Sequence, residues 1–220
     1  MHPSYFVIGT DTNAGKTYVA SALLRHFAAK GIKAVGMKPV ASGCEPGKHG
    51  IWQGQLMNDD VVALYEAGSV SAPLDLINPY RFAPAIAPHI AAEEVGVEID
   101  LELIVRAYQS LADMADMLIV EGAGGFFVPL NDEQTLADLA VKLNLPIILV
   151  VGMRLGCINH ALLTVEAIKA RGLQLAGWVA NQIDPDMPML EENLASLRQR
   201  IDAPCLSVVG WQDKAINFQL

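Results

Sequence analysis

Continuous hydrophobic runs recur along the chain, and most are followed by a polar turn and then by residues with helical spacing. These runs do not alternate with polar residues, which is typical of strands that are covered on both faces. They lie at Tyr5–Ile8, Ala34–Met37, Met117–Val120, Pro146–Val151, Leu175–Ala180 and Cys205–Val209. Strands that alternate with helices predict an α/β fold built on a doubly wound, mostly parallel sheet.

The stretches between these runs have the periodicity of helices. The predicted helices lie at Lys16–Lys30, Asp60–Ala67, Leu101–Ala115, Leu136–Leu143, Ile158–Arg171 and Met189–Arg200. Gly31 and Gly172 stand just beyond two of them, where helices commonly end. In a doubly wound fold, ligands bind at the carboxyl ends of the strands, so we expect the functional residues there.

Two segments lack either periodicity. Residues Ala41–Asn58 are rich in glycine, and we expect a mobile loop that leaves the second strand. Residues Asn78–Pro88 are rich in proline, and we expect them to be irregular. The 220 residues show no internal repeat and no linker, so we predict one domain that spans residues 1–220.

The segment between the first strand and the first helix has the layout of a phosphate-binding loop. It reads GTDTNAGKT from Gly9 to Thr17, with one residue more between its glycines than the usual pattern. The loop amides and the helix N-terminus favour a polyphosphate, Lys16 would neutralise phosphate charge, and the Thr17 hydroxyl would bind magnesium. We also expect Asp11 to orient a loop amide or Lys16. The motif predicts a fold of the P-loop NTPase type.

Charged residues stand at the ends of the next predicted strands. Lys38 ends the second hydrophobic run, where its ammonium would reach the crevice and bind a phosphoryl group or an anionic reactant. Glu121 follows the third run, like the acidic residue that holds magnesium in phosphate-loop enzymes. Asp59 and Asp60 open a predicted helix, where either can serve as the N-cap and either can complete a magnesium shell.

The fifth hydrophobic run ends in Asn181-Gln182-Ile183-Asp184. The Asn181 amide suits hydrogen bonding to an adenine edge. The segment also resembles the Asn-Lys-x-Asp base reader of GTPases, with Gln182 in place of lysine. At this point the residues leave ATP, GTP and CTP open.

Composition narrows the classes of partner. Hydrophobic residues make up 52% of the chain and charged residues 18%, which predicts a folded globular protein. The formal net charge of −9 argues against nucleic acid and membrane surfaces as partners. Three cysteines without paired spacing indicate reduced thiols in a cytoplasm. We see no signal peptide, and the longest apolar run, Leu145–Met153, is too short to span a membrane.

Together these segments resemble the dethiobiotin synthetase family, and the matching blocks extend over nearly the whole chain. The blocks are GTDTNAGKT, GMKPVASG, NDD, NPYRF, PHIAAE, VEGAGG, LPIILVVGMRLGCINHALLT and LAGWVANQ. The resemblance implies an ATP- and Mg²⁺-dependent ligase of biotin biosynthesis. Its substrates would be 7,8-diaminopelargonic acid, CO2 and ATP, and its products dethiobiotin, ADP and phosphate. It implies a carbamate on one amine, attack of that carbamate on the γ-phosphate to give a carbamic-phosphoric anhydride, and ring closure by the second amine.

The resemblance also implies roles for individual residues. Lys38 is expected to be the catalytic lysine, and Thr17, Asp60 and Glu121 are expected to bind Mg²⁺. The expected nucleotide contacts are Asn13, Ala14, Gly15, Lys16, Thr17, Tyr18, Asp60, Glu121, Gly122, Ala123, Gly124, Asn181, Gln182, Gly210, Trp211 and Gln212. The family is a homodimer with its site at the interface. The expected substrate contacts are Thr12 and Ser42, together with Leu155, Gly156, Cys157, Ile158 and Asn159 of the neighbouring subunit.

Three other classes of protein fit the residues less well. A P-loop switch ATPase of the partitioning or cytoskeletal type would carry an additional lysine early in the loop, whereas Thr10, Asp11 and Thr12 follow Gly9. A GTPase-like binding module would need a complete Asn-Lys-x-Asp, and Gln182 breaks that pattern. An amide-forming ligase of cofactor synthesis usually carries a second, glutamine-splitting domain, for which 220 residues leave no room.

Overall fold

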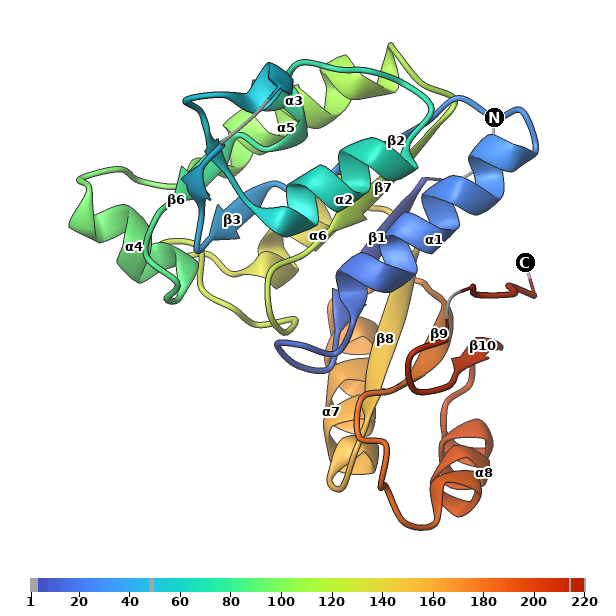
Figure 1. Cartoon of the computed structure of the whole chain (residues 1–220). Coiled ribbons are helices and arrows are strands. Elements are labelled where there is room, and N and C mark those ends of the chain that lie inside the picture. Colours follow the sequence, from blue (N-terminus) through green and yellow to red (C-terminus); the bar gives the residue numbers. More distant parts are fainter. Residues whose placement is uncertain (1–3, 48–49, 214, 220) are drawn as a thin grey trace.

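A six-stranded sheet runs through the centre of the molecule in the order β10-β9-β8-β1-β7-β2 (Figure 1). The structure is a computed structural model of the chain, and it describes residues 4–47, 50–213 and 215–219. All neighbouring strands of this sheet pair in parallel. The strands are β1 (Tyr5–Gly9), β2 (Ala34–Met37), β7 (Met117–Glu121), β8 (Ile147–Met153), β9 (Leu175–Gln182) and β10 (Cys205–Val209). The predicted doubly wound α/β fold is therefore confirmed.

The predicted helices are all present, with small shifts at their ends. The helices are α1 (Lys16–Ala29), α2 (Asp59–Ala67), α3 (Leu74–Ile77), α4 (Pro88–Glu94), α5 (Leu101–Ala112), α6 (Leu136–Leu143), α7 (Cys157–Ala170) and α8 (Leu190–Arg200). The largest shift is in α5, which ends at Ala112 rather than at Ala115. It ends early because Met114 already donates to the Leu111 carbonyl in a tighter turn, and β7 begins shortly after at Met117.

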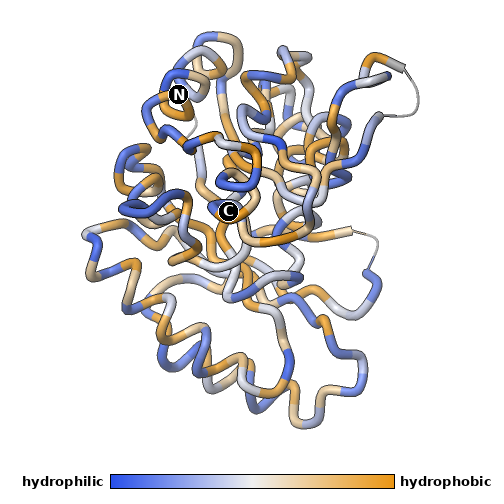
Figure 2. Tube along the Cα trace, turned by 90° about the vertical axis from the view of Figure 1, so that its left-hand side faces the viewer, coloured by the Kyte–Doolittle hydropathy of each residue, from blue (hydrophilic) through white to orange (hydrophobic). Residues whose placement is uncertain are grey.

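Helices cover both faces of the sheet, which explains why its strands are hydrophobic throughout. α1 and α2 pack on one face, where their side chains share a buried cluster with Val7 and Ile119. α5, α6 and α7 pack on the other face, in a cluster that contains Phe6 and Val120. Figure 2 shows hydrophobic residues along the interior strands and a mixture of hydrophobic and hydrophilic residues along the outer helices. Neighbouring residues of one strand thus point into two different cores.

The winding of the sheet reverses at β1. β7 and β2 lie on one side of β1, and β8, β9 and β10 lie on the other. α1 leaves β1 on one face, whereas α6, which connects β7 to β8, packs on the opposite face. The two connections diverge, so a crevice opens at the carboxyl end of β1. The glycine loop begins at this point.

The expectation that Ala41–Asn58 forms a loop without regular structure was wrong for the described part of that segment, and its mobility stays a prediction. It contains the end of β3 (Val40–Ser42), then β4 (Glu45–Pro46), a short 3-10 helix at Gly50–Trp52, and β5 (Leu56–Met57). β4 and β5 pair as antiparallel strands. Residues 48 and 49 lie outside the described residues. Strands this short leave no periodicity for a sequence pattern to reveal.

The prediction of irregular structure over Asn78–Pro88 was also wrong in part. Residues Tyr80–Phe82 form β6, which pairs in parallel with β3. Pro88 is the first residue of α4, a position where its missing N–H group has no partner to lose. β3 and β6 form a small second sheet that continues the chain beyond the end of β2.

Two expectations from composition can be compared with the structure. Cys44, Cys157 and Cys205 are not joined in disulfides in the structure, and the reduced state of a cytoplasm stays a prediction. Among the helices of the described residues, none combines the length and the hydrophobicity needed to cross a membrane.

Candidate active site

A cavity of about 930 Å³ lies at the carboxyl ends of β1, β2 and β7. It contains most of the residues expected at the phosphate, metal and substrate positions. Those that line it are Thr12, Asn13, Gly15, Lys16, Thr17, Tyr18, Lys38, Ser42, Asp60, Glu121, Ala123 and Gly124. They come from four separate stretches of sequence, which the sheet brings together because parallel strands end at the same edge.

The conformation of the glycine loop requires glycine at position 15. Gly15 has a φ of +91°, a left-handed value that favours glycine. A Cβ atom at Gly15 would lie 2.1 Å from Nδ2 of Asn181, so a side chain there would also collide with β9. Nδ2 of Asn181 donates to the Ala14 carbonyl at 2.9 Å and holds the loop from below. The loop is therefore fixed at the N-terminus of α1.

Lys16 is held by the loop itself. Its Nζ donates to the Asp11 carbonyl oxygen at 3.0 Å, and the Asp11 carboxylate accepts from the Thr12 amide at 2.7 Å. The expectation that Asp11 orients a loop amide or Lys16 is confirmed for both. The Asp11 carboxylate also pairs with the Arg154 guanidinium, which comes from the end of β8. Sequence reasoning missed Arg154, because no local pattern connects residues so far apart.

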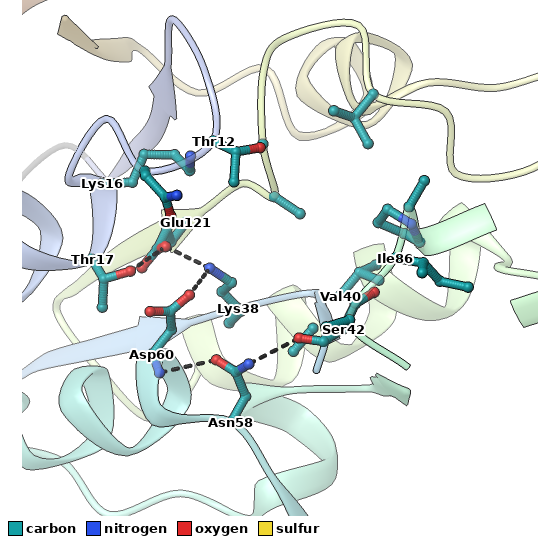
Figure 3. Close-up of a pocket in the computed structure, with 18 of the residues that line it drawn as sticks. Thr12, Lys16, Thr17, Lys38, Val40, Ser42, Asn58, Asp60, Ile86 and Glu121 are labelled. Atoms are coloured by element: carbon teal, nitrogen blue, oxygen red, sulfur yellow. Dashed lines mark hydrogen bonds and ion pairs between the residues drawn. The ribbon is translucent and has the colours of Figure 1, made fainter. Parts of the chain in front are cut away.

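Lys38 lies among the residues expected to bind the metal. Figure 3 shows its ammonium between the Asp60 and Glu121 carboxylates. Nζ of Lys38 lies 2.7 Å from Oδ2 of Asp60 and 2.5 Å from Oε1 of Glu121. The Thr17 hydroxyl donates to the same Glu121 oxygen at 2.7 Å. Thr17, Lys38, Asp60 and Glu121 form one polar cluster, which we call the carboxylate cluster.

The protonation of these groups follows from burial and from their partners. Burial, together with the neighbouring Lys38 ammonium, lowers the pKa of Lys16 to about 8. Burial also opposes the charged form of Lys38, but the Glu121 and Asp60 carboxylates outweigh it and raise the pKa of Lys38 above its ordinary value. Burial raises the pKa of Glu121 even though Lys38 acts in the opposite direction.

Asp60 differs from Glu121 because it is more exposed. Burial acts to raise the pKa of Asp60, but Lys38 and the Thr17 hydroxyl outweigh it, and the pKa falls below its ordinary value. Asp60 is therefore the firmly ionised carboxylate of the cluster. The Asp60 side chain is 42% exposed to solvent, whereas the Glu121 side chain is fully buried.

The donor set of the carboxylate cluster fits magnesium. Thr17, Asp60 and Glu121 offer oxygen ligands, which this cation prefers. Oε2 of Glu121 is buried without a hydrogen-bond partner, so one carboxylate oxygen is available to a cation. In the described part of the chain, no group of three or more His, Cys, Asp or Glu side chains is arranged to hold a metal. A magnesium ion here would therefore complete its shell with phosphate or water oxygens, as is common for this ion.

The N-cap of α2 is Asn58, and the expectation that Asp59 or Asp60 caps the helix was wrong. Oδ1 of Asn58 accepts from the Asp60 amide at 2.9 Å. The Asn58 amide group also donates to the Ser42 carbonyl at 3.0 Å, which joins α2 to β3 (Figure 3). Because Asn58 satisfies the helix end, the Asp60 carboxylate is free to face Lys38.

The wall opposite the charged residues is apolar. Val40 and Ile86 lie across the cavity from Lys16 and Glu121 in Figure 3. The other hydrophobic residues of this wall are Ala41, Ala85, Ala87, Pro88 and Val128. None of them was predicted as a site residue. Apart from Val128, which follows β7, these residues lie in β3 or after β6, and the pairing of β3 with β6 brings those two segments together.

Several predicted residues lie outside the cavity lining. Among the expected nucleotide contacts, these are Ala14, Gly122, Asn181, Gln182, Gly210, Trp211 and Gln212. Gln182 and the C-terminal segment do approach each other, since the Trp211 amide donates to Oε1 of Gln182 at 3.3 Å. The Tyr18 hydroxyl donates to the Asp213 carbonyl, which ties the same segment to α1.

The residues expected to bind the substrate carboxylate, Leu155 to Asn159, also lie outside the cavity lining. They form the turn before α7 and its first residues. Leu155 is 91% exposed, whereas Cys157 is buried. The turn therefore presents an apolar side chain to solvent in the single chain.

Comparison with known proteins shows a close similarity in sequence. A family model described as an AAA domain matches residues 3–218. The chain is 54% identical over 211 residues to the ATP-dependent dethiobiotin synthetase BioD of Nitrosospira multiformis, covering 96% of this chain and 89% of that protein. It is 57% identical over 207 residues to the ATP-dependent dethiobiotin synthetase BioD of Aromatoleum aromaticum, covering 94% of this chain and 89% of that protein.

Solved structures with the same fold have distant sequences. The chain resembles a chain of the MinC:MinD cell division protein complex of Aquifex aeolicus, with a TM-score of 0.59 and 13% identity. That match covers 97% of this chain and 83% of the other. It also resembles the signal recognition particle receptor FtsY of Elizabethkingia anophelis, with a TM-score of 0.54, 15% identity and coverage of 100% and 63%. At such low identity these structures support the fold alone.

Proposed function

The chain belongs to the dethiobiotin synthetase family, and on that basis we propose that it carboxylates 7,8-diaminopelargonic acid and closes the ureido ring of dethiobiotin at the expense of ATP. As a member of this family it is an ATP-dependent ligase of biotin biosynthesis. The observation that carries the detailed proposal is the cavity. Two buried lysines and a set of oxygen ligands meet there with an apolar wall.

The proposed reaction joins two anions. One amine of the substrate takes up CO2 as a carbamate and loses a proton, and a carbamate oxygen then attacks the γ-phosphorus of ATP, which breaks the bond between that phosphorus and the bridging oxygen and releases ADP. The mixed anhydride that forms is attacked at its carbon by the second amine, which closes the ring and releases phosphate. A carbamate and a triphosphate repel each other, so the site has to supply positive charge and fixed orientation.

Lys16 and Lys38 supply that charge from two sides. Lys16 and the loop amides would bind the phosphates of ATP. Lys38 would contact the carbamate and the transferring phosphoryl group, and so stabilise the charge that develops between them. The carboxylate cluster supports this role, because Asp60 and Glu121 keep Lys38 charged although only 5% of the residue is exposed.

Thr17, Asp60 and Glu121 would hold the magnesium ion. When bound, that ion supplies Lewis-acid charge to the phosphate oxygens. Around it, the chain's own residues keep the reactants in position. Asn58 fixes the start of α2 and with it the position of Asp60. Gly122, next to Glu121, lies so close to α6 that a Cβ atom there would come within 2.7 Å of the Leu136 side chain, so glycine is needed at this position.

The remaining contacts divide the substrate from the nucleotide. Thr12 and Ser42 would bind the polar end of the diamine, and the apolar wall at Val40 and Ile86 would contact its aliphatic chain. On the opposite side, Gln182 would read the base. The contact between Gln182 and Trp211 supports such a role, because it places the C-terminal segment beside the end of β9.

The substrate carboxylate would be bound by the Leu155–Asn159 turn of a second subunit in a homodimer. The exposure of Leu155 at 91% and of Leu163, on the helix α7 that follows this turn, at 62% supports an apolar contact surface there. Light scattering of the purified chain tests this part. A mass of twice 23.6 kDa is expected, and a monomer at micromolar concentration would contradict it.

The experiment that tests the function is incubation of the purified chain with 7,8-diaminopelargonic acid, bicarbonate and MgATP, followed by mass spectrometry. The expected result is a ureido product formed in equal amount with ADP. Nucleotide preference is tested in the same assay, where ATP is expected to give a higher kcat/KM than GTP or CTP. ADP formation without the ureido product would favour an ATPase of the switch type instead.

A further inference from the structure

Asn78 is a polar residue with no exposed surface, and no role in the site follows from the residues considered so far. It is the C-terminal cap of α3 and stands before β6. It does not line the cavity. Burying an amide side chain is costly unless its groups are paired, so its partners indicate what it does.

The backbone around Lys38 needs such a partner. β2 pairs with β7 only as far as Met37, and β3 pairs with β6 only from Val40 onward. Lys38 and Pro39 therefore lie between the two paired stretches, and of these two residues Pro39 is held by β6, since its carbonyl accepts from the Tyr80 amide at 3.1 Å. Pro39 also lacks an N–H group. Lys38, which lines the cavity, thus lies at the break between the two pairing registers.

Asn78 and its neighbour hold Lys38 by both of its backbone groups. The Lys38 amide donates to the Ile77 carbonyl at 2.8 Å, and the Lys38 carbonyl accepts from Nδ2 of Asn78 at 2.6 Å. The same Nδ2 donates to the Tyr80 carbonyl at 3.1 Å. The Asn78 amide thus ties the Lys38 backbone to the first residue of β6.

We infer that Asn78 is a positioning residue for the ligase reaction, which fixes the backbone from which Lys38 reaches the carbamate and the transferring phosphoryl group. This inference rests on the proposed function of Lys38. Asn78 itself touches no reactant. It acts by keeping the Lys38 ammonium within reach of its targets, and displacement of a catalytic group by a fraction of an ångström is enough to slow a reaction strongly.

Oδ1 of Asn78 has a further bearing on this inference. This oxygen is buried and has no hydrogen-bond partner. An unpaired buried acceptor lowers stability, so the Asn78 amide makes its two donated hydrogen bonds while its oxygen carries an energetic cost. This favours a role for the donors at the Lys38 carbonyl beyond packing alone.

The test is a double-mutant cycle between Asn78→Ala and Lys38→Ala. Asn78→Ala is expected to lower kcat on the order of 10-fold to 100-fold, with the MgATP dissociation constant, measured by calorimetry, unchanged within about twofold. In the Lys38→Ala background, the same substitution is expected to change kcat by less than about twofold. Asn78→Ser, which keeps a single donor, is the second variant and enters the same cycle if Asn78→Ala does not fold.

Asn131 offers a matched control. Its Nδ2 donates to the Ile99 carbonyl at 3.0 Å, and it does not line the cavity. Asn131→Ala is expected to lower the thermal midpoint but to leave kcat within about twofold of the unaltered chain. An equal loss of kcat from Asn78→Ala in both backgrounds would overturn the inference about Asn78. Full activity of Lys38→Ala alone would instead overturn the proposed role of Lys38.

Discussion

The two lysines of the cavity lie in regions that shift the pKa of the lysine side chain in opposite directions. Lys16 and Lys38 are almost equally buried, with exposed fractions of 6% and 5%. Lys16 has a neutral backbone carbonyl as its partner, and its pKa falls to about 8. Lys38 has two carboxylates as partners, and its pKa rises. Burial alone therefore does not decide the charge of a buried lysine, because the partner that the fold supplies outweighs it.

The difference suits the two anions that the proposed reaction brings together. The glycine loop leaves Lys16 in need of a negative partner, which the phosphates of ATP can provide. The carboxylate cluster keeps Lys38 charged whether or not a reactant is present. In the proposed reaction, Lys16 would therefore serve nucleotide binding, whereas Lys38 would serve the chemical step. The predictions below test this division of roles.

Removal of Lys38 is expected to have the largest effect. Lys38→Ala should lower kcat roughly hundredfold to thousandfold, equivalent to about 3 kcal/mol, because a group that stabilises developing charge is lost. Steady-state kinetics with the diamine and MgATP measure this. Lys33→Ala is the control, since Lys33 is exposed at the opposite end of the same strand. Near-normal turnover by a folded Lys38→Ala protein would show that the carboxylate cluster serves the fold alone.

Neutralising Glu121 should weaken the fold. Glu121→Gln leaves the buried Lys38 ammonium with Asp60 alone, and loss of one member of a buried pair costs roughly 3 kcal/mol of unfolding free energy. Urea unfolding at neutral pH measures it. Asp60→Asn should lower the unfolding free energy clearly less, because the Asp60 carboxylate is partly exposed to solvent. If Asp60→Asn proved the more destabilising change, the account of the cluster would have the two carboxylates in the wrong order.

Nucleotide binding should be coupled to the protonation of Lys16. With a pKa of about 8, Lys16 is half protonated near that pH, and the triphosphate would restore its charge. Binding at pH 8 should therefore take up about half a proton per nucleotide more in the unaltered chain than in Lys16→Arg, which stays charged. Calorimetry in buffers of different ionisation enthalpy measures the uptake. Equal uptake by both proteins would show that Lys16 is already fully charged.

The same shift affects stability with a defined sign. Between pH 8 and the ordinary lysine value of 10.5, the unfolded chain holds a proton at Lys16 that the folded chain has lost. The unfolding free energy contributed by Lys16 therefore rises with pH across this window. Lys16→Arg should lack this contribution, which urea unfolding at pH 8 and pH 10 would reveal as a difference between the two proteins.

The smallest effect is expected at the ion pair between Asp11 and Arg154. Both side chains are partly exposed, and pairs of that kind contribute at most about 1 kcal/mol. Arg154→Ala should therefore lower the unfolding free energy by less than that, with kcat within about twofold of the unaltered chain. A larger loss of activity would mean that the end of β8 takes a direct part in holding the glycine loop.

Much of the glycine loop could be predicted from sequence because its functional groups are contiguous. Lys16 and Thr17 belong to one short motif, and the strand that precedes this motif fixes the position of the loop in the sheet. Lys38 and Glu121 could be placed together because parallel strands end at one edge. The sequence did not show that Lys38 lies between Asp60 and Glu121, since that depends on where α2 begins.

The residues that escaped prediction act through contacts without a local pattern. Asn58 was overlooked as a cap because two aspartates beside it are equally suitable by type. Asn78 lies in a proline-rich segment whose three-residue strand has no periodicity. The bond from Asn181 to Ala14 joins residues 167 positions apart, so only the folded sheet brings them together. The contacts of buried polar residues of this kind depend on the tertiary structure rather than on their neighbours in sequence.

The central claim is that a carbamate oxygen attacks the γ-phosphorus in this cavity, and isotope transfer tests it most directly. The purified chain is mixed with the diamine, MgATP and freshly dissolved C18O2 in ordinary water, and the released phosphate is analysed by mass spectrometry. One 18O atom in the phosphate for each ureido ring formed is the expected result, because the attacked phosphorus keeps the carbamate oxygen. Ureido product accompanied by phosphate without 18O would contradict the account.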